Sequence, residues 1–334
     1  MVPLQRTSPL HDRPGGATRA RARQTAGKNR DWHDGPVSQS SPSVSRSGRP
    51  PDLMRSSARW TTRIAVAMLL GAGLASVVSA QIGWGGSRRS RTAPRFKPAE
   101  HRDNGFAFCR LMYTSVRSER EGYGWSTDYP AADVNFMIRF SELTSTAVDL
   151  GDRGNPNHWV VEITSPELFT CPFVLASDVG TIGLSGDEVA RLREYLLKGG
   201  FLWVDDFWGS AAWAQWSAEI GRVLPPGQYP ILDLPLSHPL FTAMYNIWEV
   251  PQIANIRFWR RTGGSSTSER GRDSAEAHFR VITDTDGRIL VAMTHNTDIQ
   301  DSWEREGEDT RYFEQFAPDG YSLGVNVLLH AMSH

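Results

Sequence analysis

Two adjacent aspartates form the first group of residues in this sequence that could do chemistry. Asp205 and Asp206 directly follow residues 201–204 (FLWV), an apolar run that is too short for a helix and typical of a buried strand. In a parallel sheet, ligands bind at the carboxyl ends of the strands, where this pair would lie. Neighbouring strand residues point to opposite faces, so both carboxylates could bind one ion only if the chain bends there. We favour a structural interpretation, in which one aspartate caps a helix starting near Ser210 or accepts hydrogen bonds from loop amides.

A histidine after another predicted strand is a second candidate for the same edge. His238, in the sequence LSHP, could act there as a base or a ligand. Together with Asp205 and Asp206 it makes up the set of candidate catalytic residues. A lone histidine before a proline is as often a turn residue, and that alternative stays open.

Three acidic residues in segment 295–304 (HNTDIQDSWE) have a spacing that could bind a metal. Asp298, Asp301 and Glu304 are three residues apart, so a helical turn would place them on one side, beside His295. Carboxylate oxygens are the ligands of hard cations such as calcium and magnesium. The spacing does not match an EF-hand loop, and we favour a solvated acidic turn. We therefore expect no cofactor, with calcium or magnesium as the alternative.

An aromatic side chain beside the aspartate pair could take part in binding. Trp208 lies in a predicted loop next to the carboxylates and could stack on a sugar ring while Asp206 accepts hydroxyl hydrogens. Such an arrangement would suit a cell-envelope glycan. Aromatic residues near strand ends also plug the edge of a sheet, which is the structural alternative.

The predicted elements indicate one α/β domain over residues 105–334, with three layers and a mainly parallel sheet. Apolar runs without polar alternation, separated by helices, indicate strands that are covered on both faces. Ser185 and Glu188 form a capping box at the start of the clearest helix, and Gly199 follows its end. The expected strands are 106–113, 147–150, 159–163, 173–176, 201–204, 231–234, 279–284 and 288–293, and the expected helices are 133–143, 185–197, 211–223 and 321–332.

The first part of the chain has the composition of a leader. Residues 1–53 are rich in Arg, Ser, Pro and Gly, and we expect either a disordered basic leader or an over-extended start. Residues 54–80 form an export signal with three arginines, an apolar stretch and the small residues VSA, so cleavage is expected after Ala80. The uncharged residues 64–80 could instead remain as a single-pass membrane anchor. Residues 81–104 are predicted to be a flexible basic linker. Either alternative puts the folded domain outside the cytoplasm, in the periplasm or the extracellular space.

Charge and cysteine content restrict the partners. Residues 1–63 carry 12 basic and 4 acidic residues, whereas residues 101–334 carry 19 basic and 32 acidic residues. An acidic domain argues against nucleic acid as its partner, because phosphate contacts need clustered Lys and Arg. The two cysteines, Cys109 and Cys171, could pair in an oxidising compartment. Because Cys109 lies in an apolar run, we expect two independent buried thiols.

Several separated motifs resemble a bacterial family without an assigned activity, Domain of Unknown Function 4159. They include Trp125 with DYPAAD at 128–133, LREYLLKGGFL at 192–202, VDDFWG at 204–209, His238-Pro239, the segment 296–304 and LGVN at 323–326. The resemblance covers nearly all of residues 105–334. It implies a Rossmann-like, flavodoxin-like fold similar to class I glutamine amidotransferases and their trehalose-utilisation relatives, and it implies no activity.

The sequence departs from the amidotransferases at the nucleophile. Those enzymes place a cysteine on a strained turn after a central strand and carry a later His-Pro-Glu. The corresponding turn here reads SDVG at 177–180, and His238-Pro239 is followed by Leu240. Without a thiolate, glutaminase chemistry has no nucleophile, and we exclude it.

We therefore expect an exported, non-catalytic module that binds an envelope protein or a glycan in a crevice at the strand ends. The candidate ligand-binding residues are Ser177, Asp178, Trp208, Asn296 and Trp303. The alternative is a metal-assisted hydrolase acting on an envelope carbohydrate or ester, with a site built from Asp205, Asp206, His238 and Glu304.

Overall fold

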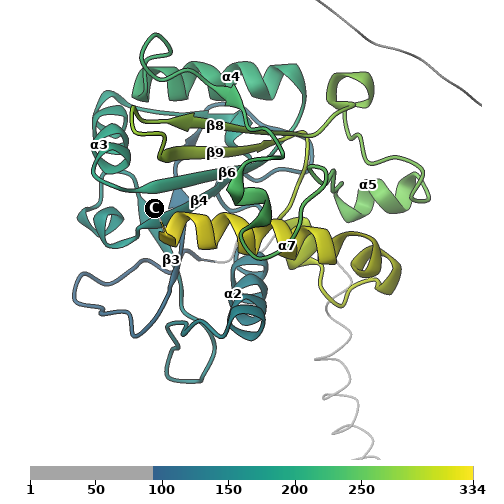
Figure 1. Cartoon of the computed structure of the whole chain (residues 1–334), viewed down its shortest axis with the longest axis horizontal. Helices are drawn as coiled ribbons and strands as arrows, with labels where there is room; N and C mark the ends of the chain where they lie inside the picture. Colours follow the sequence, from purple (N-terminus) through teal and green to yellow (C-terminus); the bar gives the residue numbers. More distant parts are fainter. Residues whose placement is uncertain (1–92, 334) are drawn as a thin grey trace, which may run out of the picture. The chain divides into compact units, whose positions relative to one another are not determined.

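The computed structural model describes residues 93–333 and has an α/β fold built on a seven-stranded sheet. Five strands are parallel, and Figure 1 shows them stacked with helix α7 crossing in front. Two further strands continue the sheet beyond β9 in antiparallel pairings. In spatial order the strands are β3 (His158–Glu162), β1 (Phe108–Met112), β4 (Phe173–Ser177), β6 (Phe201–Phe207), β9 (Ile289–His295), β8 (His278–Thr283) and β7 (Leu232–Asp233).

The order of the parallel strands determines where a ligand would bind. Along the chain, the five strands are β1, β3, β4, β6 and β9, so their spatial order is second, first, third, fourth, fifth. This is the flavodoxin-like order, in which the chain reverses direction across the sheet between the first and third strands. The crevice of such a fold lies outside the carboxyl ends of these strands, here β1 and β4.

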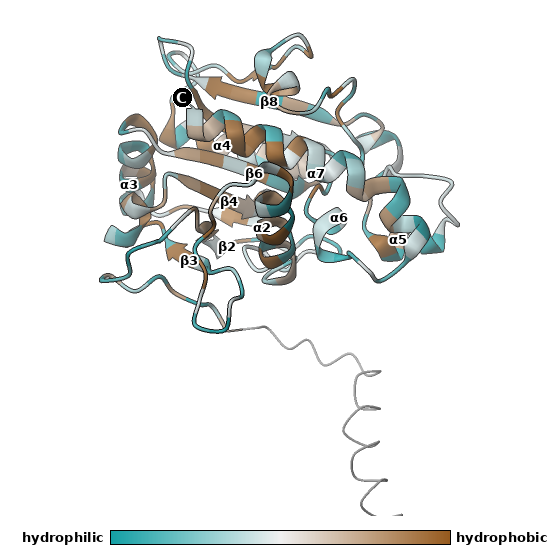
Figure 2. Cartoon of the chain, turned by 60° about the horizontal axis from the view of Figure 1, so that its bottom comes forward, coloured by the Kyte–Doolittle hydropathy of each residue, from teal (hydrophilic) through white to brown (hydrophobic). Residues whose placement is uncertain are grey.

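Helices cover both faces of the sheet and complete three layers. Alternate residues of each central strand enter two separate cores: Val204 packs with α3 (Gly186–Leu197) and α4 (Gly209–Val223), and Trp203 packs with α2 (Ala131–Thr144) and α7 (Thr310–Ser333). The strands are therefore apolar on both faces, which Figure 2 shows as hydrophobic colouring along β4 and β6. The remaining short elements are the small sheet of β2 (Thr114–Ser115) and β5 (Ile182–Gly183), the helices α5 (Ile256–Arg261) and α6 (Asp301–Glu304), and the 3-10 turns η1 (Pro166–Thr170), η2 (Val179–Thr181), η3 (Pro239–Thr242) and η4 (Gly271–Ser274).

Most of the expected elements are present, but several differ in extent, and β6 continues through both aspartates to Phe207. The capping box of α3 is confirmed, since Ser185 accepts from the Glu188 amide and the Glu188 side chain accepts from the Ser185 amide. The hairpin of β8 and β9 is also confirmed. Residues 147–150 form only isolated bridges, so the strand expected there is wrong. The last helix begins at Thr310, earlier than residue 321, because Pro318 is accommodated inside it.

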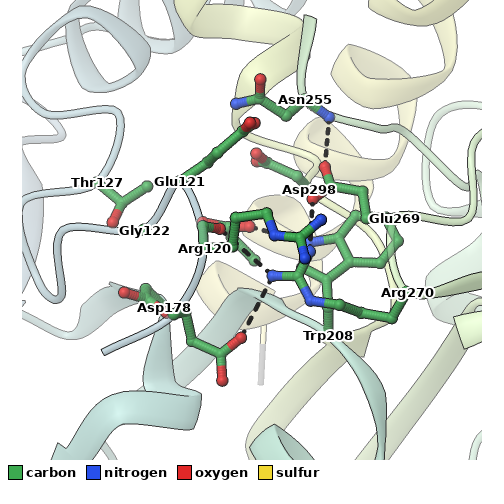
Figure 3. Close-up of a pocket in the computed structure, with 12 residues that line it drawn as sticks. Arg120, Glu121, Gly122, Thr127, Asp178, Trp208, Asn255, Glu269, Arg270 and Asp298 are labelled. Carbon is green, nitrogen blue, oxygen red and sulfur yellow. Dashed lines mark hydrogen bonds and ion pairs between the residues drawn. The ribbon is translucent and has the colours of Figure 1, made fainter. Parts of the chain in front are cut away.

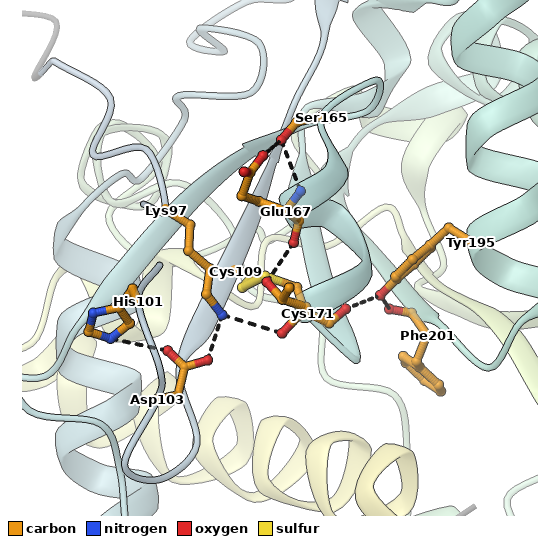
Figure 4. The surroundings of a disulfide bond; sticks show 10 residues. Lys97, His101, Asp103, Cys109, Ser165, Glu167, Cys171, Tyr195 and Phe201 are labelled. Carbon is orange, nitrogen blue, oxygen red and sulfur yellow. Dashed lines mark hydrogen bonds and ion pairs between the residues drawn. A yellow bond between two sulfur atoms is a disulfide. The ribbon is translucent and has the colours of Figure 1, made fainter. Parts of the chain in front are cut away.

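The expectation of two independent thiols is wrong, because Cys109 and Cys171 form a disulfide (Figure 4). Cys109 lies on β1, and Cys171 lies just before the neighbouring strand β4, with 6.1 Å between their Cα atoms. This separation suits a disulfide. The pairing depends on β1 and β4 being neighbours in the sheet, which the sequence separation of 62 between the cysteines does not reveal.

The predicted leader, export signal and most of the linker lie outside the described residues. Within residues 93–333, no helix combines the length and the apolar character needed to cross a membrane.

Candidate functional site

Three adjacent parallel strands end in residues with a left-handed backbone. Asp178 follows β4 with φ +50°, Asp206 lies near the end of β6 with φ +54°, and Asn296 follows β9 with φ +62°. The loop between β2 and α2 contributes Asp128 with φ +63°. Asp and Asn tolerate this conformation better than other non-glycine residues, but it is still strained and is concentrated at functional sites. The carboxyl rim of the sheet, where these residues gather, is therefore the candidate site.

A bulge in β6 separates the two adjacent aspartates. The register with β9 shifts between Val204 and Phe207, so the chain bends at the aspartates. Asp205 is fully buried and accepts hydrogen bonds from Thr294 Oγ1 (2.5 Å) and from the backbone amide of Gln300 (3.1 Å). Asp206 instead turns towards the crevice and accepts from Trp208 Nε1 at 3.1 Å.

Of the two structural roles expected for one aspartate of the pair, capping a helix or accepting a loop amide, the structure shows the second. Asp205 does accept a loop amide, at Gln300. Neither aspartate caps α4, because Asp273 accepts from the Ser210 amide at 2.9 Å. Asp206 neither caps a helix nor accepts a loop amide, and its carboxylate lies near other carboxylates, first among them Asp178.

A network beneath the rim fixes the inner polar groups. The buried guanidinium of Arg110 donates to Asp133, to Ser177 Oγ (2.6 Å) and to Gln300 Oε1 (2.7 Å). Gln300 in turn donates its backbone amide to Asp205. Here the buried charges of Arg110 and Asp133 compensate each other.

Three carboxylates meet at the rim, and none of them forms an ion pair among residues 93–333. Asp128, Asp206 and Asp298, which we call the rim triad, each present an oxygen within 4.8 Å of the others. Their hydrogen bonds come from neutral donors, Trp208 Nε1 to Asp206 and the Asp301 amide to Asp298. The Oδ2 atom of Asp128 is buried and has no hydrogen-bond partner among the described residues. Unit charges about 4 Å apart repel by about 4 kcal/mol at an effective dielectric constant of about 20, so the triad cannot hold three bare charges cheaply.

The pKa values of the rim triad are all raised. Burial raises the pKa of Asp128, Asp206 and Asp298 well above the usual range, and nearby carboxylates raise it further. For Asp206 the first of these neighbours is Asp178, whose own pKa is raised by burial to about 7. Either protons or a cation must therefore neutralise part of this charge at neutral pH.

A second acidic group beside the triad carries its own cation. Asp128, Asp301 and Glu304 also lie within 4.8 Å of one another, but Arg305 forms ion pairs with Glu304 (2.7 Å) and Asp301 (3.4 Å). Asp301 also accepts from the Ile256 amide at 2.9 Å. Burial still raises the pKa of Glu304 to about 7.

Two members of the triad, Asp206 and Asp298, line a small acidic crevice, and Figure 3 shows Asp298 there. The free volume of the crevice is about 10 Å³, which is room for the centre of one water molecule or one ion. Two arginines reach it, and Arg270 forms ion pairs with Glu119 and Glu269. A Cβ on Gly122 would overlap the Asp178 carboxylate, so a glycine lets this loop close over the rim. The acidic lining residues are Glu119, Glu121, Asp178, Asp206, Glu269 and Asp298, against Arg120 and Arg270.

Most of the expected ligand-binding residues are buried in structural contacts. Trp303 packs in the core against Phe136 with ring centroids 4.3 Å apart, and Ser177 is bound to Arg110. Asn296 accepts from the Gly209 amide at 2.8 Å. Trp208 is only 4% exposed, which leaves little ring surface for a sugar. Asp178 lines the crevice, with its carboxylate accepting from the Gly124 amide at 2.8 Å.

His238 does not approach the carboxyl rim. Its ring lies 5.5 Å from that of His330, and His330 lies beside Phe201 and Ile289, the first residues of β6 and β9. The His238 Nδ1 atom accepts a hydrogen bond from the Leu240 amide at the start of η3, so His238 is a turn residue, as the alternative interpretation expected. The expectation that it reaches the same edge as the aspartates is wrong, because β7 is followed by a turn that leads away from the rim.

The fold and the site together define a three-layer α/β domain with an acidic crevice at the carboxyl ends of its parallel strands. Residues 108–332 match the family described as domain of unknown function (DUF4159), and the chain belongs to that family. A comparison with curated proteins found no match.

Proposed function

We propose that the protein is an exported, non-catalytic binding module whose crevice takes a positively charged group. The observation that carries this proposal is the lining of the crevice, in which six acidic residues face two arginines. An excess of buried carboxylates favours a cationic ligand, because the ligand relieves their repulsion. The partner would be an envelope component that presents such a charge, as a protein side chain or as a cation held by a glycan.

Two features support export. Residues 54–80 have the pattern of an export signal. The disulfide between Cys109 and Cys171 is of the kind that persists in oxidising compartments. A domain outside the cytoplasm, either released near Ala80 or held by an uncleaved anchor, agrees with both.

The nucleophile position supports binding without turnover. The turn after β4 has the left-handed backbone of a nucleophile elbow, but it carries Asp178, and both cysteines of the chain are in the disulfide. The flavodoxin-like strand order agrees with similarity to class I glutamine amidotransferases. On this view the chain keeps their architecture and uses the crevice without their covalent chemistry.

The test is turnover measured beside binding. The full-length chain, exported with its own leader, should leave model esters, phosphoesters and glycosides intact, and should bind a lysine-rich peptide or a divalent cation more weakly after Asp206→Asn. Hydrolysis of any of these substrates that disappears in Asp206→Asn would contradict a non-catalytic module.

One observation favours a metal-assisted hydrolase as the second candidate. Burial raises the pKa of Asp178 to about 7, where a carboxylate can act as a general base, and Asp178 lines the crevice together with Asp206 and Asp298. Turnover that requires an added divalent cation and is lost in Asp178→Asn would identify this alternative.

A further inference from the structure

Resting on the proposed function, we infer that the rim triad of Asp128, Asp206 and Asp298 binds one hard divalent cation of the calcium or magnesium class. All three ligands are carboxylate oxygens, which these cations prefer, and each oxygen lies within 4.8 Å of the others. Three oxygens within 4.8 Å of one another lie at most about 2.8 Å from a common centre. Ca²⁺ binds oxygens at about 2.3–2.6 Å, so one ion can contact all three after side-chain shifts of a few tenths of an ångström, whereas the smaller Mg²⁺ requires larger shifts.

An unsatisfied buried atom points to the ligand independently of the charge. Asp128 is 8% exposed, and its Oδ2 atom has no hydrogen-bond partner in the part of the chain that the structure describes. Buried carboxylate oxygens nearly always have a partner. Asp128 lies between β2 and α2 in a left-handed conformation that holds it at the rim, so a cation there would satisfy an atom that the protein does not.

Two other buried carboxylates near the rim form ion pairs with arginines. Asp133 is paired with Arg110, and Glu269 is paired with Arg270. The ion pairs found between residues 93 and 333 include none to a member of the rim triad. The triad thus brings together three carboxylates that have no ion pair among the described residues, whereas Asp205, which also has none, accepts hydrogen bonds from Thr294 and from the Gln300 amide.

The arginine beside the second acidic group argues against a second cation there. The second acidic group, Asp301 and Glu304 with Asp128, has the Arg305 guanidinium at 2.7 Å from Glu304. A second divalent ion at that group would face the positive charge of the guanidinium.

The bound cation would remain open to a partner. The three ligands come from separate places, the loop between β2 and α2, the bulge of β6 and the loop after β9. Two of them, Asp206 and Asp298, line a crevice that opens to solvent. Six to eight oxygens bind Ca²⁺, so three carboxylates leave coordination positions for water or for oxygens of a partner. We infer that the cation connects the crevice to an oxygen-rich envelope ligand.

The experiment measures metal binding by the full-length chain and two variants. Calcium and magnesium are titrated into chelator-treated protein by calorimetry and by thermal melting, and metal retained on purification is measured by mass spectrometry. The wild type should bind one cation and melt at a higher temperature with it. Asp206→Asn should lower the affinity at least about tenfold. Asp187→Asn, which alters an exposed acid on α3, should behave like the wild type.

Thermal melting in chelator shows whether Asp206→Asn folds in the absence of metal. Without metal, Asp206→Asn should melt at or above the wild-type temperature because it removes a repelling charge, so a lost metal response cannot be attributed to misfolding. No binding by the wild type up to a few millimolar, where extracellular calcium modules bind, would overturn the inference. An equal response in Asp206→Asn would overturn it too.

The outcomes also separate this inference from the proposed function. Metal binding accompanied by substrate turnover would retain the cation and reject the non-catalytic module. Binding of a lysine-rich peptide without any metal binding would retain the module and reject the cation.

Discussion

Two groups of carboxylates lie side by side at the carboxyl rim and share Asp128, yet they differ in their counter-charge. Asp301 and Glu304 have Arg305 beside them, so the chain itself supplies the cation. Asp206 and Asp298 have neutral donors only, and Asp128 keeps an unsatisfied oxygen. We infer from this difference that Arg305 balances the first group, and we propose that a cation from outside the chain balances the rim triad.

The largest effect should come from removing an internal counter-charge that is completely buried. Arg110→Met leaves Asp133 without its partner in the interior, and we expect the free energy of unfolding to fall by about 3–5 kcal/mol. Arg139→Met is the control, because Arg139 forms ion pairs at the surface that contribute at most about 1 kcal/mol. Urea denaturation measures both. Equal losses in the two variants would contradict the importance of internal compensation.

A smaller effect should follow from removing Arg305. Its side chain is 25% exposed, so Arg305→Met should lower the free energy of unfolding by about 2 kcal/mol rather than by the full cost of a buried pair. The variant should also become more sensitive to calcium or magnesium than the wild type, because Asp301 and Glu304 then lack a cation. Thermal melting with and without each ion measures this. A loss of stability that no divalent cation restores would contradict the idea that Arg305 replaces a metal.

The free energy of unfolding of the metal-free protein should depend on pH, because the buried carboxyl groups have raised pKa values in the folded state. Burial raises the pKa of Asp178 and Glu304 to about 7, so the folded state binds more protons than the unfolded state, in which carboxyl pKa values are about 4. Stability should therefore fall by about 1 kcal/mol per pH unit as the pH rises from about 6.5 to about 8. Burial lowers the pKa of His295 to about 4, so His295 adds stability as the pH rises from about 4 to its unfolded value of about 6.5, and this opposing contribution fades above about pH 7.

Saturating cation should flatten that slope, because metal binding favours the ionised carboxylates. Denaturant unfolding at several pH values, in chelator and in excess calcium, measures both slopes. Stability that rises with pH in chelator would contradict the raised pKa values, and equal slopes in both buffers would contradict their link to the metal.

The smallest effect should come from neutralising one member of the rim triad. In chelator, Asp206→Asn should raise the free energy of unfolding by about 1 kcal/mol, since it removes repulsion without emptying the core. Asp187→Asn should stay within about 0.5 kcal/mol of the wild type. A clear destabilisation by Asp206→Asn would show that its bond from Trp208 outweighs the repulsion.

The fold could be predicted well from the sequence because its signals are local. Apolar runs marked the central strands, and Ser185 with Glu188 marked the start of α3. The failures depend on tertiary contacts. The disulfide needs β1 and β4 to be neighbours, and Pro318 hid the first half of α7 by resembling a helix end.

The site could be predicted only in pieces. Asp206 was a candidate because it follows a predicted strand, and Asp298 was one because of its spacing with Asp301 and Glu304. The structure brings Asp206 and Asp298 together. Asp128 was not a candidate, because it lies in a polar loop without periodicity and reaches the rim only through the strand order. Arg305 directly follows Glu304 in the sequence, so the ion pair that distinguishes the second acidic group from the rim triad could have been predicted from this adjacency.

The most direct test of this account is a calorimetric titration of the metal-free wild type and Asp206→Asn with calcium and with magnesium. The account predicts one bound cation in the wild type and an affinity at least about tenfold weaker in the variant. A wild type that binds neither ion, or a variant that binds as well as the wild type, would contradict it.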